Sequence, residues 1–131
     1  MLKMGFEAEG AVRELLRQKK HEYGQLDLVS IDRATQKIYI WEIKHQERFK
    51  APPFDGHGLP PWQFKFRLEV ARKTNTIPIL IIVEPGSEPG SKKVFYQSLF
   101  ILEKLPADKK FMTKTGKRIV FNIDAFNEMT I

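Results

Sequence analysis

Cysteine is absent from the 131 residues of this chain. Disulfide bonds and thiolate metal sites are therefore excluded. Long apolar runs are missing too, because the stretch from Ile77 to Val83 contains a proline and is far too short to cross a bilayer. The first residues also lack the apolar segment of a signal peptide. We therefore expect an intracellular, cytoplasmic protein without a membrane-spanning segment.

Several chemical motifs are missing as well. The sequence contains no internal repeat, glycine-rich phosphate loop, zinc-ligand spacing or nucleophile elbow. What remains is a chain with 42% hydrophobic and 29% charged residues and a net charge of +6. This composition and length predict one globular domain over residues 1–131, and the positive charge favours a polyanionic partner such as nucleic acid.

Residues 26–32 and 37–44 are rich in β-branched and aromatic side chains and are separated by the polar stretch 33–36. They predict a β-hairpin. If Asp32 lies opposite Lys37, the same register places Asp27 opposite Glu42. Because side chains alternate between faces with period two, Lys44 shares the face of Glu42.

Two carboxylates in directly opposed positions would have Cβ atoms roughly 5 Å apart and would repel each other. A shared proton, the ammonium of Lys44 or a divalent cation could offset this repulsion. Mg²⁺ is commonly held by one or two carboxylates together with water molecules. The alternative is an exposed Glu42–Lys44 ion pair with little energetic value.

The pattern of Asp27 followed by Glu42-Ile43-Lys44 resembles the metal-binding core of the PD-(D/E)XK nuclease superfamily. The resemblance implies that Asp27, Glu42 and the carbonyl of Ile43 hold Mg²⁺, with Mn²⁺ as a substitute. It also implies that Lys44 positions or activates the attacking water. Leu26 stands where the motif has proline, which is not a metal ligand.

Residues 5–20 predict an amphipathic helix whose apolar side is buried. Gly5 and Glu9, followed by Val12, resemble the opening of archaeal Holliday junction resolvases. That resemblance implies that Glu9 is a third acid at the metal site, that the DNA substrate is branched and that the protein forms a homodimer. Alternatively, Glu7 and Glu9 only complement the positive end of the helix dipole.

Residues 45–61 contain four prolines and two glycines, which predicts a loop without regular structure. We expect Arg48 and Lys50 in this loop to bind the DNA backbone. Phe49 and Phe54 could stack on bases or pack onto the domain.

Residues 62–74 predict a second helix, which begins just after two prolines. Phe66 and Val70, together with Leu68 and Ala71, are expected on its buried side, and Lys65 and Arg67 are expected to bind DNA. Gln63 resembles the glutamine that related nucleases carry near the metal or the scissile phosphate, although it could equally have no role.

The apolar residues 77–83 predict a strand buried on both faces and parallel to strand 37–44 through a right-handed crossover. Further strands are expected at 94–102 and 118–123, with a loop at 105–117 and a final turn capped by Asp124. Together with the resemblance, these elements indicate an α/β fold with a restriction-endonuclease-like core, in which helices flank a mixed central sheet of about five strands.

Two functional hypotheses follow. The first is a Mg²⁺-dependent endonuclease that hydrolyses DNA phosphodiester bonds and has the structure specificity of a Holliday junction resolvase. Its catalytic set is Glu9, Asp27, Glu42, Lys44 and Gln63. The second is a non-catalytic nucleic-acid-binding module built on a nuclease-like fold. Metal-dependent cleavage of DNA separates the two.

Overall fold

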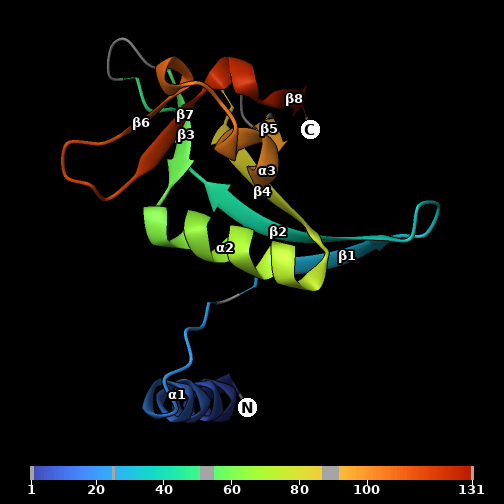
Figure 1. The fold of residues 1–131 in the computed structure, drawn as a ribbon, viewed down its shortest axis with the longest axis vertical. Coiled ribbons are helices and arrows are strands. Elements are labelled where there is room, and N and C mark those ends of the chain that lie inside the picture. The colour runs from blue at the N-terminus through green and yellow to red at the C-terminus, as the bar shows by residue number, and fades with distance from the viewer. Residues whose placement is uncertain (1, 25, 51–54, 87–91, 131) are drawn as a thin grey trace.

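The computed structural model describes residues 2–24, 26–50, 55–86 and 92–130 (Figure 1). Within these residues the α-helices are α1 (Leu2–Gln18), α2 (Pro61–Thr74) and α3 (Leu99–Glu103). The strands are β1 (Leu28–Asp32), β2 (Lys37–His45), β3 (Gly56–Leu59), β4 (Ile77–Pro85), β5 (Lys92–Ser98), β6 (Lys110–Met112), β7 (Ile119–Asn122) and β8 (Asn127–Thr130). Two 3₁₀ turns, η1 (Ala107–Lys109) and η2 (Ile123–Ala125), complete the set.

The central element is a five-stranded mixed sheet with strand order β1-β2-β4-β5-β8. Strands β1 and β2 form the predicted hairpin, with Asp32 opposite Lys37 and Leu28 opposite Trp41. Strand β4 lies parallel to β2, as the crossover predicts, and the remaining neighbours are antiparallel. The α/β class and the mixed five-stranded sheet are therefore confirmed.

Helices α2 and α3 cover one face of this sheet, and a second sheet with strand order β3-β7-β6 lies beyond the N-terminal end of α2 (Figure 1). The hydrophobic core fills the space between these layers. It comprises Leu59, Phe64, Leu68, Leu80, Ile82, Phe95, Leu99, Leu102 and Phe121. On the opposite sheet face Ile79 is buried whereas Ile81 and Val83 are only half-buried, so the expectation that β4 is buried on both faces holds for only part of the strand. No described helix is both long and apolar enough to span a membrane.

Strand β3 lies within the stretch expected to be a loop, and that expectation is wrong for Gly56–Leu59. This strand pairs antiparallel with β7, placing Gly58 opposite Val120. A Cβ at Gly58 would lie 1.9 Å from the carbonyl oxygen of Ile119. Glycine is thus required here by the close approach of two backbones, rather than by a flexible loop.

The C-terminal third differs from the expected pattern in four places, one of which is that β8 (Asn127–Thr130) lies where most of the final turn was expected. Strand β5 ends at Ser98, whose hydroxyl accepts a hydrogen bond from the Phe100 amide at 3.2 Å and caps α3. The expected loop at 105–117 contains η1 and β6. Asn122, not Asp124, caps the turn after β7, because its side chain accepts from the Asp124 amide at 3.1 Å.

Helix α1 forms where the sequence predicts it, but its apolar side is not buried. Val12 is 53% exposed and Leu15 is 52% exposed. Figure 1 shows α1 apart from the two sheets, joined to them by the segment that precedes β1. The periodic pattern of this helix is therefore real, whereas its expected packing against the sheet is wrong. The side chain of Glu7 lies outside the described residues.

A polar cluster joins the ends of β2, β3 and β4. His57 is fully buried, and its ring nitrogens contact the side-chain oxygens of Gln46 and Glu84. Arg48 donates two hydrogen bonds to Glu84, at 3.0 and 3.2 Å, and lies over the ring of Phe95. Although burial opposes it, hydrogen bonding from Arg48 and His57 holds the pKa of Glu84 below its usual value.

We expect Glu84→Gln to lower the free energy of unfolding at pH 7 by about 3 kcal/mol, because Arg48 and His57 would lose their carboxylate partner. Since the pKa of Glu84 is lowered by folding, its contribution is fully present above the ordinary value of 4.5 and is lost as the pH falls through the folded-state pKa. Urea denaturation at several pH values should show the difference from wild type shrinking below pH 4.5. A difference in the free energy of unfolding that stays equally large below pH 4.5 would contradict this account. The control is Glu14→Gln, because Glu14 forms an exposed ion pair with Arg17.

Candidate active site

A cleft of about 350 Å³ opens where the hairpin meets the start of α2. It lies on the sheet face that α2 covers. Its walls come from the segment before β1, the end of β2 and the first two turns of α2. The lining residues are Gly24, Asp27, Glu42, Ile43, Lys44, Trp62, Gln63, Phe66 and Arg67.

The geometry of α2 matches that of β2. Glu42 and Lys44 are two residues apart on a strand and so lie about 6.6 Å apart along the same face. Gln63 and Arg67 are four residues apart on a helix and so lie about 6 Å apart along one side. Gln63 therefore meets Lys44, and Arg67 meets Glu42.

Glu42 is a buried carboxylate with two cationic partners. It is only 5% exposed, and its Oε2 accepts hydrogen bonds from Nε and Nη2 of Arg67 at 3.1 and 2.9 Å. Nζ of Lys44 lies 3.3 Å from Oε1. Because a buried carboxylate without a partner is costly, these two cations make its ionised form compatible with burial.

Lys44 is fixed from two sides at the end of β2. Its Nζ donates a hydrogen bond to Oε1 of Gln63 at 2.9 Å, in addition to its contact with Glu42. Its side chain is 24% exposed, so the ammonium remains accessible from the cleft. The result is a positioned cation beside a carboxylate.

Asp27 reaches the same place from the residue just before β1. Its Oδ2 accepts a hydrogen bond from the backbone amide of Ile43 at 2.8 Å. The paired register of β1 and β2 ends at Leu28 and Trp41, and this side-chain bond holds Asp27 next to the following part of β2. Both carboxylates line the cleft.

The donor set of the cleft suits a hard divalent cation. Asp27, Glu42 and the backbone carbonyl of Ile43 supply only oxygen atoms, which Mg²⁺ prefers, and water molecules usually complete its shell. Among the described residues no three His, Asp or Glu side chains come together as a metal site. Two carboxylates are sufficient for Mg²⁺ and would not suit zinc.

Other residues expected at the site lie elsewhere. Glu9 is exposed on α1, pairs with Arg13 at 3.5 Å and does not line the cleft. Arg48 is engaged by Glu84 rather than exposed for DNA. Phe49 packs against Phe111, and Phe54 lies outside the described residues. Lys50 and Lys65 are exposed, so both are accessible to a nucleic acid in solution.

The position of Arg67 differs most from expectation. The sequence suggests an outward-facing basic residue on α2, with Phe66 and Val70 inside. Leu68 and Ala71 are buried as expected, but Phe64 and Arg67 accompany them in place of Phe66 and Val70, and Arg67 is only 6% exposed. A signal was present, because an arginine spaced three and four residues from large apolar side chains shares their face.

Comparisons of this chain with family models, with curated proteins and with solved structures gave no match. The function therefore has to be argued from the cleft itself.

Proposed function

We propose that this chain is a Mg²⁺-dependent endonuclease that hydrolyses DNA phosphodiester bonds, with a restriction-endonuclease-like core. The observation that carries this proposal is the meeting of Asp27, Glu42, Lys44 and Gln63 in one cleft. They come from three parts of the chain: the segment before β1, strand β2 and helix α2. A chance surface ion pair would not require this convergence.

Each residue of the cleft has a chemical task in this proposal. Asp27 and Glu42, with the carbonyl of Ile43, would hold Mg²⁺, which neutralises phosphate charge and lowers the pKa of a bound water. Lys44 orients the attacking water and stabilises negative charge that develops on the phosphate. Gln63 keeps the ammonium of Lys44 in place through its 2.9 Å hydrogen bond.

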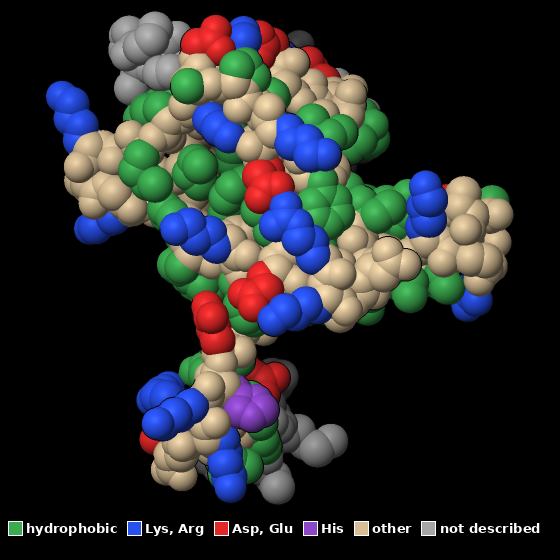
Figure 2. All heavy atoms as spheres, in the orientation of Figure 1, with side chains coloured by type: hydrophobic (Ala, Val, Ile, Leu, Met, Phe, Trp, Pro, Cys, Tyr) green, Lys and Arg blue, Asp and Glu red, His purple; other side chains and the backbone are tan. Residues whose placement is uncertain are grey.

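The surface around the cleft is consistent with a DNA partner. The chain carries a net charge of +6, and Figure 2 shows Lys and Arg side chains spread over the face that contains α2, interspersed with a few acidic ones. Such scattered basic charge binds the phosphate backbone without reading sequence. We propose that Lys50 and Lys65 make such contacts, that the substrate is branched DNA and that the protein acts as a homodimer.

A binding module without catalysis is the second candidate, and one observation favours it. Both oxygens of Glu42 already face cations of the protein, Arg67 and Lys44. A site neutralised in this way could be a remnant that retains the fold and has lost the metal.

Cleavage assays separate the two candidates. Supercoiled plasmid and a synthetic four-way junction are incubated with the protein in Mg²⁺, in Mn²⁺ or in EDTA. The endonuclease proposal expects products only with metal, and expects Asp27→Asn to remove them. Retardation of both DNAs without any product would select the binding module.

Trp62 is expected to contribute to DNA binding. It lines the cleft beside Gln63 and is 54% exposed, an unusual position for a large aromatic side chain. An aromatic ring stacked on an unpaired base contributes about 1–3 kcal/mol. Trp62→Ala should therefore weaken binding of a single-stranded oligonucleotide by about 5- to 150-fold in EDTA, as measured by fluorescence anisotropy. Met112→Ala, at an exposed apolar residue away from the cleft, is the control; an equal effect of both changes would exclude stacking at Trp62.

A further inference from the structure

Arg67 pairs with the carboxylate of Glu42, which the proposed metal would need as a ligand. Its Nε and Nη2 both donate to the same oxygen, Oε2 of Glu42. A carboxylate oxygen offers two lone pairs in its plane, and two donors from one guanidinium use both. The remaining oxygen, Oε1, has Nζ of Lys44 at 3.3 Å.

We propose that Arg67 is the counterion of Glu42 in the metal-free protein, and that a divalent cation binds by displacing its guanidinium from Oε2. This inference rests on the function proposed above for the same cleft. Arg67 is a positioning residue in this scheme, because it acts on the metal through Glu42.

Burial is the physical reason for such an arrangement. Glu42 is 5% exposed, and Arg67 is 6% exposed. Without a metal, the carboxylate needs an internal cation, and a planar guanidinium supplies charge and two directed donors at once. The protein can then fold before it meets metal. The consequence is weaker metal binding, because the cation must first break the Arg67–Glu42 pair.

The position of Arg67 determines where its guanidinium goes once it is released. Its side chain lines the cleft, together with Lys44 and Trp62, so the guanidinium stays within the space that a phosphate would enter. Metal binding would thus convert an internal counterion into a cation that faces the substrate.

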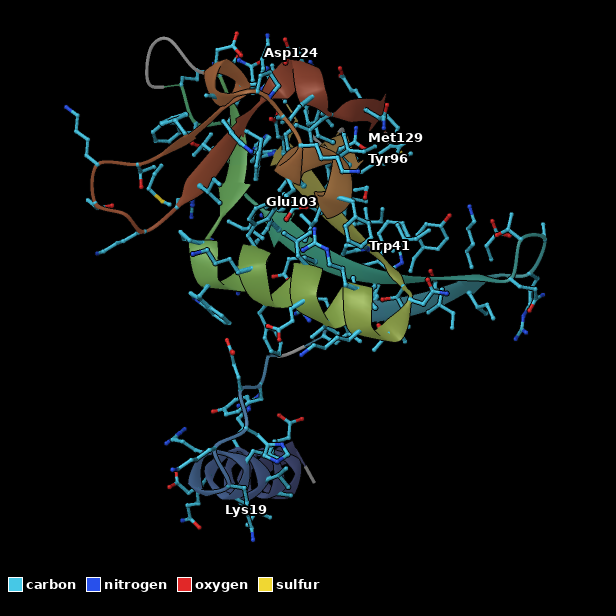
Figure 3. The ribbon with its side chains drawn as sticks, viewed as in Figure 1. Lys19, Trp41, Tyr96, Glu103, Asp124 and Met129 are labelled. Atoms are coloured by element: carbon cyan, nitrogen blue, oxygen red, sulfur yellow. The ribbon has the colours of Figure 1, made fainter. Side chains whose placement is uncertain are left out.

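The test measures metal binding without DNA and without catalysis. Wild type, Arg67→Met, Arg67→Lys and Arg72→Met are titrated with MnCl₂ by calorimetry and melted in EDTA and in Mn²⁺. Arg72 is the matched control, because it lies on the same helix but pairs with Glu103 of α3, which Figure 3 labels, and neither residue lines the cleft.

If the metal displaces the guanidinium, Arg67→Met should bind Mn²⁺ at least about 5-fold more tightly than wild type. This is the usual size of the coupling between two partners, here Arg67 and the metal, that compete for one carboxylate. In EDTA the same variant should have a lower melting temperature than wild type. Adding Mn²⁺ should raise its melting temperature by more than it raises that of wild type. Arg67→Lys keeps the charge but loses the paired donors, so its affinity for Mn²⁺ should lie between those of wild type and Arg67→Met. Arg72→Met should match wild type.

Two results would overturn the inference. If Arg67→Met binds Mn²⁺ no more tightly than wild type, the guanidinium does not compete, although the metal site stands. If neither wild type nor Arg67→Met binds Mn²⁺, the proposed function fails together with the inference. Should Arg67→Met not fold in EDTA, Arg67→Lys carries the same comparison.

Discussion

Lys44→Met should reduce Mg²⁺-dependent cleavage of plasmid DNA by about 10²- to 10⁴-fold, the usual contribution of a group that assists proton transfer and charge stabilisation. The ammonium of Lys44 lies 3.3 Å from Glu42 and 2.9 Å from Gln63, so it is held at the proposed reaction centre. Methionine keeps the length of the side chain and removes the charge. DNA binding in EDTA should change little, because only one of many positive charges is lost.

The control for this change is Lys37→Met, on the same strand but at the far end of the hairpin. It removes an identical charge from an exposed position and should cut DNA at the wild-type rate. Initial rates of plasmid nicking, measured with equal protein concentrations, provide the comparison. Equal rates for Lys44→Met and wild type would show that Lys44 has no role in catalysis.

Gly58→Ala should destabilise the fold by more than about 3 kcal/mol, near the upper end of what overpacking costs. The new Cβ would meet the carbonyl oxygen of Ile119 at 1.9 Å and the Cα of Val120 at 2.9 Å. These are backbone atoms of the paired strand β7, which cannot move aside as a side chain can. The backbone amide and carbonyl of Gly58 also bond the side chain of Gln46 at 3.3 Å, so a shift of β3 would break those bonds.

Urea denaturation followed by circular dichroism measures this effect. Gly10→Ala is the control, because a Cβ at Gly10 has no atom within 4 Å and alanine favours a helix. That variant should unfold at the wild-type midpoint or slightly above it. A midpoint for Gly58→Ala within error of wild type would show that β3 and β7 are not held as closely as described.

The hairpin and its partner strand could be predicted from the sequence because their signals are local. Alternation with period two and a short polar turn fix the register of residues 28–32 against 37–41, and Asp27 and Glu42 both line the cleft just beyond these paired residues. The crossover to β4 follows from chain connectivity. Lys44 follows from the same alternation, whereas Gln63 was expected near the site only from the resemblance to nucleases.

The misses arise where tertiary contacts override local preference. Gly56 and Gly58 have the composition of a loop, but they permit the close pairing of β3 with β7, a strand far away in sequence. Arg67 looks like a surface residue until Glu42 gives it a buried partner. Helix α1 has a clear apolar side, yet periodicity alone could not tell whether that side, with Glu9, would pack near the cleft.

The central claim is that Asp27 and Glu42 together bind a divalent cation. Paramagnetic broadening of amide signals by trace Mn²⁺, followed by NMR, tests it most directly because it shows where the ion lies. We expect the amides of Ile43 and Lys44 to broaden first, and Glu42→Gln to abolish that broadening. Broadening that begins instead near exposed acids such as Glu69 or Asp124, or that is unchanged in Glu42→Gln, would contradict the account.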